Sequence, residues 1–440
     1  MTQDNPPTPP DDGRARKVAT SRAKGGARKR KVPGHTVAKV ITATLTVLAL
    51  TTGVSVAVIY NHWNANIDVK DLDRQLKDRP EKKEVEGPKE PLNILVMGSD
   101  TREGEGNKID GESGGGLSDT TILVHLSANR EFAYGISIPR DTLVDRPECY
   151  EEDGTAIPAA TDAMWNAAYA VGGPACTVQQ LEQVSGVRVD NYVVIDFAGF
   201  KDMVNALDGV EVCIPEDIND TEHGIVLKAG TREIKGDEAL SYVRVRHVGS
   251  GTDLNRIKRQ QAFLAAMMNK VLSGGTLARP DRMVSFVNAL TDSIQTDFES
   301  VGELADLASS FAGIGPSNVK FVTTPWVYST AQPGRVEWTP EVEKLWRLVI
   351  NDKPLTQEFV EKSISAADDP EGSSAAPTDA ATDAATDAAT QGPSGSASQA
   401  PGGATGSAAT ESTGGASPSA TESEQGGLSD AEREYAGLCT

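Results

Sequence analysis

Two aspartates stand next to apolar segments that have the length of strands. Asp100 follows one such run in NILVMGSDTR, and Asp119 precedes the next in LSDTTILV. Strand ends that meet at one end of a sheet can bring two such carboxylates together. Two hard oxygen ligands suit Mg²⁺. An aspartate beside glycine or serine is also a common turn or cap residue, so each position has a purely structural explanation as well.

Basic and amide side chains form a second set of candidates in a chain that is otherwise acidic. Arg140 ends a strand-like run in SIPRDT, and Arg244 and Arg246 in YVRVR would face one side of an extended segment. Arg256 and Gln260 are four residues apart and share one face of an expected helix. Guanidinium groups bind phosphate through paired hydrogen bonds and keep their charge, so an arginine cluster beside Mg²⁺ suits a pyrophosphate. Surface ion pairs are the alternative for each arginine taken singly.

Two further features surround these candidates. Asp253 stands just before the expected long helix, where it is either a helix N-cap or a site carboxylate that orients or deprotonates an acceptor. The 16 residues from Arg102 to Leu117 are rich in glycine, and a loop of that length between two strands can act as a lid.

The elements that must position these residues alternate between strand and helix. Short apolar or alternating runs predict strands at residues 92–97, 121–126, 132–138, 192–195 and 210–214. Helical patterns cover residues 167–170, 177–184 and 197–207, and a long amphipathic helix follows Asp253. The second and third strands, joined by SANRE, predict a hairpin. This alternation predicts an α/β domain with a central mixed sheet covered by helices.

Residues 40–60 form an uncharged apolar run of 21 residues, which matches the ~20 residues that a transmembrane helix needs. Residues 1–39 carry 10 Lys/Arg against 3 Asp/Glu, so the N-terminus is predicted to be cytoplasmic. A cleaved secretory signal is the competing interpretation. The whole chain has a formal charge of −21, which leaves −28 after this arm of +7. So acidic an exterior argues against a nucleic-acid partner.

The composition of the remainder predicts three regions outside the membrane. Residues 61–91 are polar and are expected to form a spacer, and residues 92–352 have the composition of one globular domain. Residues 353–440 are expected to be a low-complexity, disordered tail, because a TDAA repeat begins at Thr378 and large apolar residues are rare.

The four cysteines are expected in an oxidising compartment, where disulfides form. Cys149 and Cys176 flank an insertion-like polar segment and are the favoured pair. Cys213 lies in the apolar run VEVCIP and is either simply buried or paired with Cys439, which otherwise stays free.

The order and spacing of several segments resemble the LytR-CpsA-Psr family over residues 92–272. The matching segments are LNILVMGSDTR, LSDTTILVHL, GISIPRDT, WNAAYAVGG, VDNYVVIDFAGFKDMVNALDGVEV, ALSYVRVRH and DLNRIKRQQAFL. This resemblance implies an extracytoplasmic, membrane-anchored phosphotransferase with an α/β/α fold and a groove for a polyprenyl chain. It also implies transfer of a glycopolymer phosphate from an undecaprenyl pyrophosphate carrier to peptidoglycan, with Mg²⁺, or Mn²⁺ in its place.

Site residues follow from the same resemblance, position by position. It implies that Asp100 and Asp119 are associated with the metal and that Asp253 and Gln260 are further polar site residues. The residues that it implies contact the pyrophosphate are Arg140, Arg244, Arg246 and Arg256.

Two positions depart from the family pattern. Leu117 and Met164 stand where the family often has arginine and lysine, so two positive contacts are expected to be missing. Two alternatives to the transferase stay open. One is a hydrolase of the lipid pyrophosphate, which would use the same residues, and the other is a non-catalytic protein that binds lipid or glycan, which the uncharged Leu117 and Met164 keep open.

Overall fold

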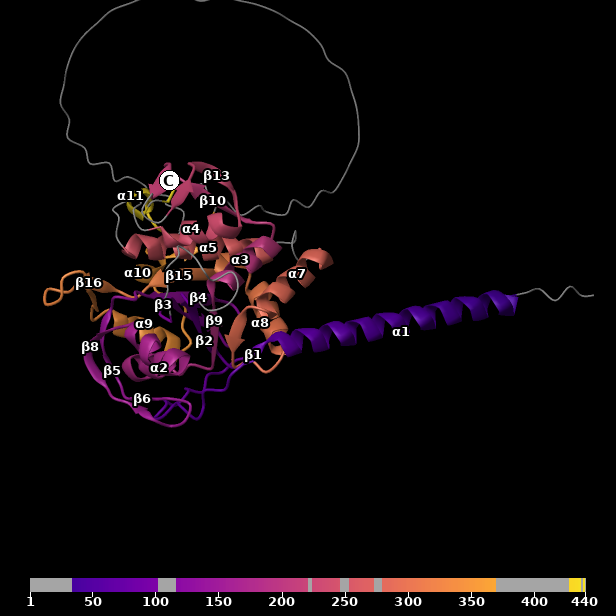
Figure 1. Ribbon diagram of the computed structural model, residues 1–440, viewed down its shortest axis with the longest axis horizontal. Coiled ribbons are helices and arrows are strands. Elements are labelled where there is room, and N and C mark those ends of the chain that lie inside the picture. The colour runs from indigo at the N-terminus through magenta and orange to yellow at the C-terminus, as the bar shows by residue number, and fades with distance from the viewer. Residues whose placement is uncertain are drawn as a thin grey trace, which may run out of the picture. The chain divides into compact units, whose positions relative to one another are not determined.

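The computed structural model describes residues 34–101, 116–220, 224–245, 253–272, 279–368, 427–436 and 438–439. The chain divides into two units, residues 1–58 and residues 59–440. Helix α1 (Gly34–Asn66), drawn in indigo in Figure 1, contains the expected span of residues 40–60. Its segment Val37–Asn66 is long and apolar enough to cross a membrane.

An eight-stranded sheet of order β1-β14-β9-β2-β3-β4-β15-β18 forms the centre of the larger unit. The strands are β1 (Asp68–Val69), β2 (Leu92–Ser99), β3 (Ser118–Leu126), β4 (Ala133–Ile138), β9 (Asn191–Ile195), β14 (Ile294–Thr296), β15 (Val319–Thr323) and β18 (Ile364–Ser365). β3 is antiparallel to both β2 and β4, whereas β2–β9 and β4–β15 are parallel pairs. The predicted mixed sheet and the predicted β3–β4 hairpin are therefore confirmed.

Helices cover both faces of this sheet, as the α/β/α expectation requires. They are α2 (Ala167–Ser185), α3 (Phe197–Ala206), α4 (Gly236–Arg244), α5 (Asp253–Leu272), α7 (Pro280–Thr291), α8 (Val301–Ile314), α9 (Val342–Ile350), α10 (Gln357–Val360) and α11 (Asp430–Ala436). Leu95 of β2 packs in one core cluster with residues of α2 and α9, and the next strand residue, Val96, packs in another with residues of α5 and α8. Successive strand residues point to opposite faces, so one strand supplies both cores. Figure 1 shows α5 on one side of the strands and α2 and α9 on the other.

Smaller paired strands extend the unit beyond the central sheet. These pairs are β5 (Leu143–Arg146) with β8 (Ala160–Met164), β6 (Cys149–Tyr150) with β7 (Ala156–Ile157), β10 (Val210–Ile214) with β13 (Gly230–Ile234), β11 (Ile218–Asp220) with β12 (Ile225–Leu227), and β16 (Trp326–Tyr328) with β17 (Val336–Trp338).

The segment expected to be a spacer, residues 61–91, is instead part of the fold. β1 pairs with β14, and Leu72 and Leu76 are buried in the core cluster that contains α2. Arg79 Nη2 forms an ion pair of 2.8 Å with Oε1 of Glu182, whose side chain is fully buried. The average composition of this segment is polar, but most of its few apolar side chains pack against the domain and several of its polar groups bond to the domain, among them Lys82 to Asp190 at 2.8 Å.

The expected boundary at residue 352 also differs from the structure. α10 and β18 both lie beyond residue 352, and β18 pairs with β15 as an edge strand of the central sheet. Residues 427–436 and 438–439 return to the domain, where Leu428, Ala436 and Leu438 pack in the core cluster that contains α5. We call residues 427–439 the C-terminal clasp. Residues 369–426, which contain the TDAA repeat, lie outside the described residues.

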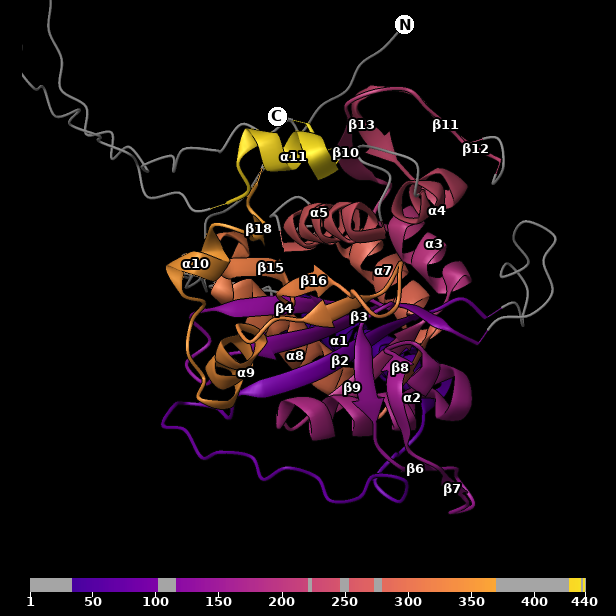
Figure 2. The same ribbon diagram turned by 90° about the vertical axis from the view of Figure 1, so that its left-hand side faces the viewer.

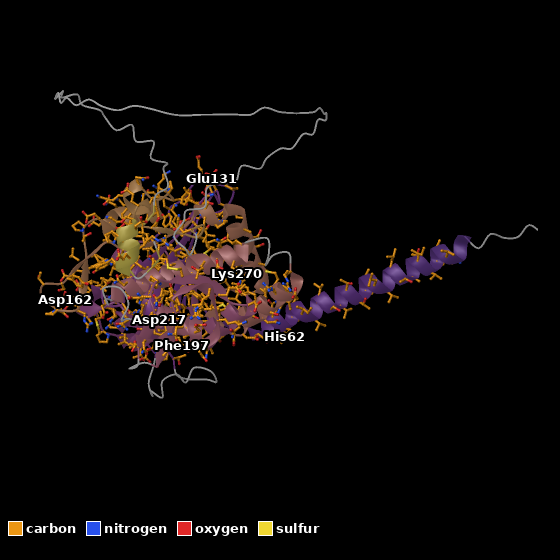
Figure 3. All side chains as sticks on the ribbon, turned by 90° about the horizontal axis from the view of Figure 1, so that it is seen from above. His62, Glu131, Asp162, Phe197, Asp217 and Lys270 are labelled. Carbon is orange, nitrogen blue, oxygen red and sulfur yellow. A yellow bond between two sulfur atoms is a disulfide. The ribbon has the colours of Figure 1, made fainter. Side chains whose placement is uncertain are left out.

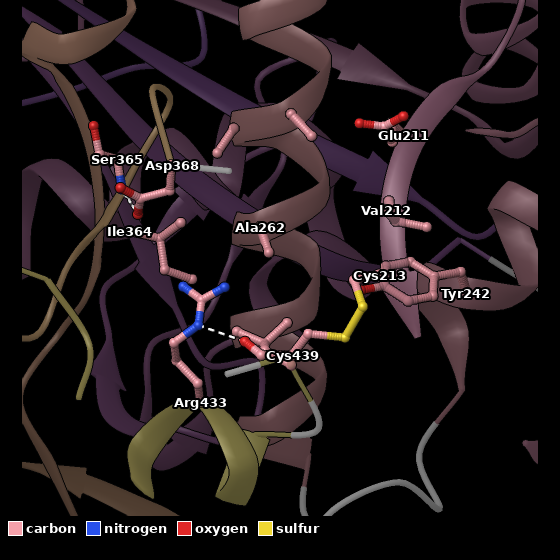
Figure 4. Close-up of a pocket in the computed structure, with 13 residues that line it drawn as sticks. Glu211, Val212, Cys213, Tyr242, Ala262, Ile364, Ser365, Asp368, Arg433 and Cys439 are labelled. Carbon is pink, nitrogen blue, oxygen red and sulfur yellow. Dashed lines mark hydrogen bonds between the residues drawn. A yellow bond between two sulfur atoms is a disulfide. The ribbon is translucent and has the colours of Figure 1, made fainter. Parts of the chain in front are cut away.

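Two disulfides pair all four cysteines. Cys149 is bonded to Cys176, as expected, and Cys213 is bonded to Cys439, which settles the pairing that the sequence left open. The second bond joins β10 to the C-terminal clasp across 226 residues of sequence, as Figure 4 shows beside α5. A cavity of about 30 Å³ next to this bond has room only for a few water molecules.

The long-range disulfide is expected to contribute more stability than the short-range one. The two bonds close loops of 226 and 27 residues, and loop closure limits the entropy of the unfolded chain more for the longer loop. Cys213→Ser/Cys439→Ser should therefore lower the free energy of unfolding by about 2 kcal/mol more than Cys149→Ser/Cys176→Ser. Urea unfolding followed by circular dichroism measures both values, and an equal or smaller loss for the Cys213 pair would contradict this account.

Candidate active site

Three charged residues proposed from the sequence lie at one end of the central sheet. Asp100 directly follows β2, Asp119 is the second residue of β3, and Arg140 comes two residues after β4. Because β3 is antiparallel to both neighbours, the end of β2, the start of β3 and the end of β4 share one end of the sheet. The hairpin thus brings together side chains that lie up to 40 residues apart in the sequence.

Arg140 is held by two carboxylates. Its Nη1 donates to Asp119 Oδ1 at 2.7 Å, and its Nε lies 3.4 Å from Asp141 Oδ2. Asp141 Oδ1 in turn accepts from Arg335 Nη1 at 2.6 Å. A guanidinium fixed in this way presents its charge in one orientation, which lowers the entropy cost of binding an anion.

Asp100 closes the base of the glycine-rich segment. Its Oδ1 accepts hydrogen bonds from the backbone amides of Gly116 at 3.1 Å and Leu117 at 2.8 Å. Its own amide donates to the Leu117 carbonyl at 3.0 Å. The expected lid, residues 102–117, lies outside the described residues except for these last two. Burial raises the pKa of the neighbouring Tyr169, and the Asp100 carboxylate adds to that rise, so this phenol stays protonated.

These residues line a cavity of about 710 Å³ that combines charged and apolar walls. The charged and amide residues are Asp100, Asp119, Arg140, Asp196, Arg244, Arg256 and Gln260. The large apolar side chains include Val96, Ile122, Phe197, Phe200, Leu240, Val243, Phe263 and Leu264. Figure 2 shows α3, α4 and α5, which carry many of these residues, grouped on one side of the sheet. Since Val96 and Ile122 lie within strands while Asp100 and Arg140 lie at strand ends, the apolar wall runs inward from the charged end.

Two helices add arginines to the same cavity. Arg256 of α5 is buried, with 2 % of its surface exposed, and Gln260, one turn later, donates from Nε2 to the Val243 carbonyl at 3.1 Å. Arg244 was expected on an extended segment, but it is the last residue of α4. Acidic Asp237 and Glu238 in the first turn stabilise this helix through its dipole, which a reading of YVRVR alone does not register.

Two further site residues proposed from the sequence are not tested by the structure. Arg246 lies outside the described residues. Of Asp253, only its place as the first residue of α5 is described. The arginine cluster thus comprises three described members, Arg140, Arg244 and Arg256, which line one cavity.

The start of α3 contributes cavity residues that sequence reasoning missed. Asp196 follows β9 and caps α3 by accepting from the Gly199 amide at 2.8 Å. Phe197 places its ring 5.0 Å from the Arg244 guanidinium carbon, which is a cation–π contact. The segment VVIDFAGF, in which an aspartate stands between a strand and a helix, could have indicated these residues. An N-cap aspartate that follows a strand lies at the sheet end where sites form in α/β folds.

Loss of the Phe197 ring is expected to weaken anion binding by releasing Arg244. Phe197→Ala should lower the affinity for inorganic pyrophosphate by roughly 3- to 30-fold, the worth of a partly desolvated cation–π contact. Phe197→Trp, which keeps an aromatic face, should retain most of the affinity. Calorimetric titration with pyrophosphate measures both variants, and equal losses for alanine and tryptophan would contradict a cation–π role.

The donor set fits a divalent cation shared with a phosphate substrate. Across the part of the chain that the structure describes, no group of three or more His, Cys, Asp or Glu side chains could hold a metal. Mg²⁺ commonly takes one or two protein carboxylates and completes its shell with phosphate oxygens and water. Asp100 and Asp119, which line one cavity with three arginines, match that pattern better than a protein-only metal site.

Comparison with known proteins decides the family. The model of the LytR_cpsA_psr family matches residues 58–347. The chain belongs to this family. Its sequence is 35% identical to the probable cell wall biosynthesis protein LcpB of Corynebacterium glutamicum, over 50% of this chain and 52% of LcpB. It is 32% identical to TagV of Bacillus subtilis, a polyisoprenyl-teichoic acid–peptidoglycan teichoic acid transferase, over 51% of this chain and 55% of TagV.

The fold matches a solved member of the family. The structure of a LytR-Csp2A-Psr enzyme from Actinomyces oris aligns with a TM-score of 0.50 and 19% identity, over 66% of this chain and all of that one. This likeness confirms the mixed sheet with helices on both faces. The chain spans about half the length of the first curated relatives that it matches.

Proposed function

We propose that this member of the family transfers a glycopolymer phosphate from a polyprenyl pyrophosphate carrier to peptidoglycan. The observation that carries the proposal is a cavity in which Arg140 and two aspartates at the sheet end, together with two arginines from helices α4 and α5, adjoin an apolar wall. The charged end suits a pyrophosphate and the apolar wall suits a polyprenyl chain. The TagV relative, whose name states teichoic acid transfer to peptidoglycan, supports the same reaction class.

The arrangement supports an in-line displacement at the distal phosphorus. A hydroxyl of the acceptor sugar attacks this phosphorus and loses its proton, while the bond to the bridging oxygen breaks and polyprenyl phosphate leaves with the electron pair. Arg140, Arg244 and Arg256 neutralise the charge that develops on the phosphate oxygens. Mg²⁺ held by Asp100 and Asp119 would supply further charge neutralisation and orient the pyrophosphate.

We propose that α1 anchors the chain as a single membrane span, with the N-terminus in the cytoplasm and the domain outside. The net charge of +7 over residues 1–39 favours this orientation, and two disulfides are typical of an exported domain. A membrane-impermeant maleimide applied to intact cells tests this orientation, with single cysteines placed at residue 20 and in the domain. Labelling of the cysteine at residue 20 would contradict the proposed orientation.

A reconstituted transfer assay tests the reaction. Full-length protein in vesicles receives a lipid pyrophosphate with a radiolabelled glycan, together with peptidoglycan. The expected products are labelled peptidoglycan and polyprenyl phosphate in equal amounts. Release of free glycan phosphate without labelled peptidoglycan would show a hydrolase instead, and neither product would show a binding protein.

A further inference from the structure

A second large cleft opens at the same end of the sheet, on the other side of α5. Its volume is about 800 Å³. Leu254 and Lys258 of α5 line it, whereas Arg256 and Gln260 line the catalytic cavity. Each pair is spaced by four residues, and the pairs differ by two positions, so they lie on opposite faces of the helix. Only the thickness of one helix therefore separates the two cavities in this region.

The floor of the cleft continues the strand next to the catalytic end. β15 is parallel to β4, with Thr323 opposite Ser137. The cleft residues Thr324, Pro325 and Trp326 follow β15, just as Arg140 follows β4. A ligand in this cleft thus lies at the sheet end that carries the proposed chemistry.

The cleft is lined by aromatic and polar side chains with little net charge. Trp326 is half-buried, and Tyr435 has 57% of its surface exposed. The polar lining residues are Asn255, Lys258, Thr323, Thr324, Thr339, Glu341, Glu358, Lys362 and Glu432. Two lysines face three glutamates, in contrast to the arginine cluster of the catalytic cavity. Aromatic faces pack against the C–H face of a sugar ring, and mixed polar groups bond hydroxyl and acetamido groups, whereas a phosphate would need excess positive charge.

The C-terminal clasp builds one wall of this cleft and is firmly held. Its lining residues are Leu428, Ala431, Glu432, Tyr435 and Ala436. Asn255 Nδ2 donates to the Tyr435 carbonyl at 2.8 Å, and Arg259 Nη1 donates to the Ala436 carbonyl at 3.2 Å. Figure 4 shows the Cys213–Cys439 disulfide and the hydrogen bond from Arg433 Nε to the Cys439 carbonyl, at 2.6 Å, that close the clasp.

Two charged residues of the cleft, Lys258 and Glu432, form hydrogen bonds within the fold. Lys258 Nζ donates to the Lys362 carbonyl at 2.8 Å, and burial lowers the pKa of Lys258 to about 8 despite the nearby Glu432 carboxylate. Glu432 accepts from the amide and hydroxyl of Ser429 at 2.9 and 2.7 Å. With Lys258 and Glu432 engaged in this way, the exposed ring of Tyr435 and the half-buried ring of Trp326 are the aromatic surfaces that a ligand would meet.

We infer that this cleft binds the acceptor, the glycan strand of peptidoglycan. The inference rests on the proposed function and adds the location of its second substrate. In-line displacement needs the attacking hydroxyl on the side of the phosphorus away from the leaving polyprenyl phosphate. The apolar wall for the polyprenyl chain runs inward on one side of α5, so an acceptor held on the other side approaches from the opposite direction.

Direct binding tests this inference independently of turnover. The probe is peptide-free peptidoglycan glycan strands, and the full-length chain in detergent is titrated by calorimetry. Trp326→Ala and Tyr435→Ala should each weaken binding by roughly 3- to 10-fold, the worth of one aromatic contact. Tyr435→Phe should bind like the unaltered chain, and Tyr150→Ala, an aromatic change on β6 outside the cleft, should have no effect.

A second set of measurements separates failure of the cleft from failure of the reaction. Arg140→Ala should lower kcat for transfer by ~10²–10³ and keep glycan binding. Trp326→Ala should raise the KM for peptidoglycan and leave the KM for the lipid-linked donor unchanged. Unaltered glycan affinity in both Trp326→Ala and Tyr435→Ala would overturn the inference, whether or not the chain is a transferase. Weaker binding of the donor glycopolymer with unchanged binding of the peptidoglycan strand would overturn the acceptor assignment as well.

Discussion

Replacement of Arg140 with alanine is expected to lower kcat for glycan transfer by ~10²–10³, the usual effect of removing one group that stabilises transition-state charge. Two causes combine at this position. The cavity loses a guanidinium, and the Asp119 carboxylate that lines it loses its ion pair with Arg140, whereas Asp141 keeps its ion pair with Arg335. The negative charge of the Asp119 carboxylate, no longer offset by the Arg140 guanidinium, opposes binding of an anionic substrate. The KM for the donor should therefore also rise.

Companion variants separate the role of the paired hydrogen bonds of the Arg140 guanidinium from the role of its charge. Arg140→Lys keeps the charge but loses the paired hydrogen bonds, so its activity should lie between that of the alanine variant and the unaltered chain. Arg347→Ala, which breaks an exposed ion pair with Glu343 on α9, serves as the matched control and should leave kcat unchanged. Activity of Arg140→Ala within about threefold of the unaltered chain would contradict the proposed role, since one such group normally contributes far more.

Removal of divalent cations is expected to lower transfer by ~10² or more, and Mg²⁺ or Mn²⁺ should restore it. Asp100→Asn separates the metal role of Asp100 from its structural role. The amide oxygen of asparagine can still accept from Gly116 and Leu117, while the negative charge that would attract the cation is lost. This variant should keep its thermal stability and need a higher Mg²⁺ concentration for half-maximal activity.

Binding gives a readout of the metal site that does not depend on turnover. Calorimetry with inorganic pyrophosphate should show Mg²⁺-dependent binding that Asp100→Asn weakens. Asp162→Asn is the matched control, because Asp162 is exposed and Figure 3 shows it well apart from Phe197, which lines the cavity. Pyrophosphate binding that is equal with and without Mg²⁺ would contradict the proposed metal role of Asp100 and Asp119.

Local patterns in the sequence predicted the part of the site that lies on the sheet. Apolar runs at residues 92–97, 121–126 and 132–138 correspond to β2, β3 and β4, because short buried strands need continuous or alternating apolar residues. A short connection between the last two strands makes them antiparallel neighbours. That pairing places Asp119 and Arg140 at one end of the sheet, and Arg256 and Gln260 share a helix face for an equally local reason.

The local pattern misled where a helix and a strand compete for the same residues. YVRVR alternates like a strand, yet Arg244 ends α4. Ala239, Leu240 and Tyr242 in that helix are buried against neighbouring elements, and burial of an amphipathic face outweighs a weak strand propensity. Arg244 nevertheless lines the cavity, because the end of α4 lies beside α3 and its Phe197.

The sequence by itself predicted the long apolar helix α1, the α/β character of the domain, the Cys149–Cys176 pair and the candidate residues Asp100, Asp119, Arg140, Arg256 and Gln260. Each of these depends on residues close together in the chain or on a resemblance carried by short motifs. Only the tertiary structure showed that residues 61–91 pack on the domain and that Cys439 closes a clasp on Cys213. The second cleft likewise became visible only there, since one of its walls comes from the clasp. Contacts between residues more than 200 positions apart leave no local period in the sequence, and a few scattered apolar residues become ordered only through the surface that they meet.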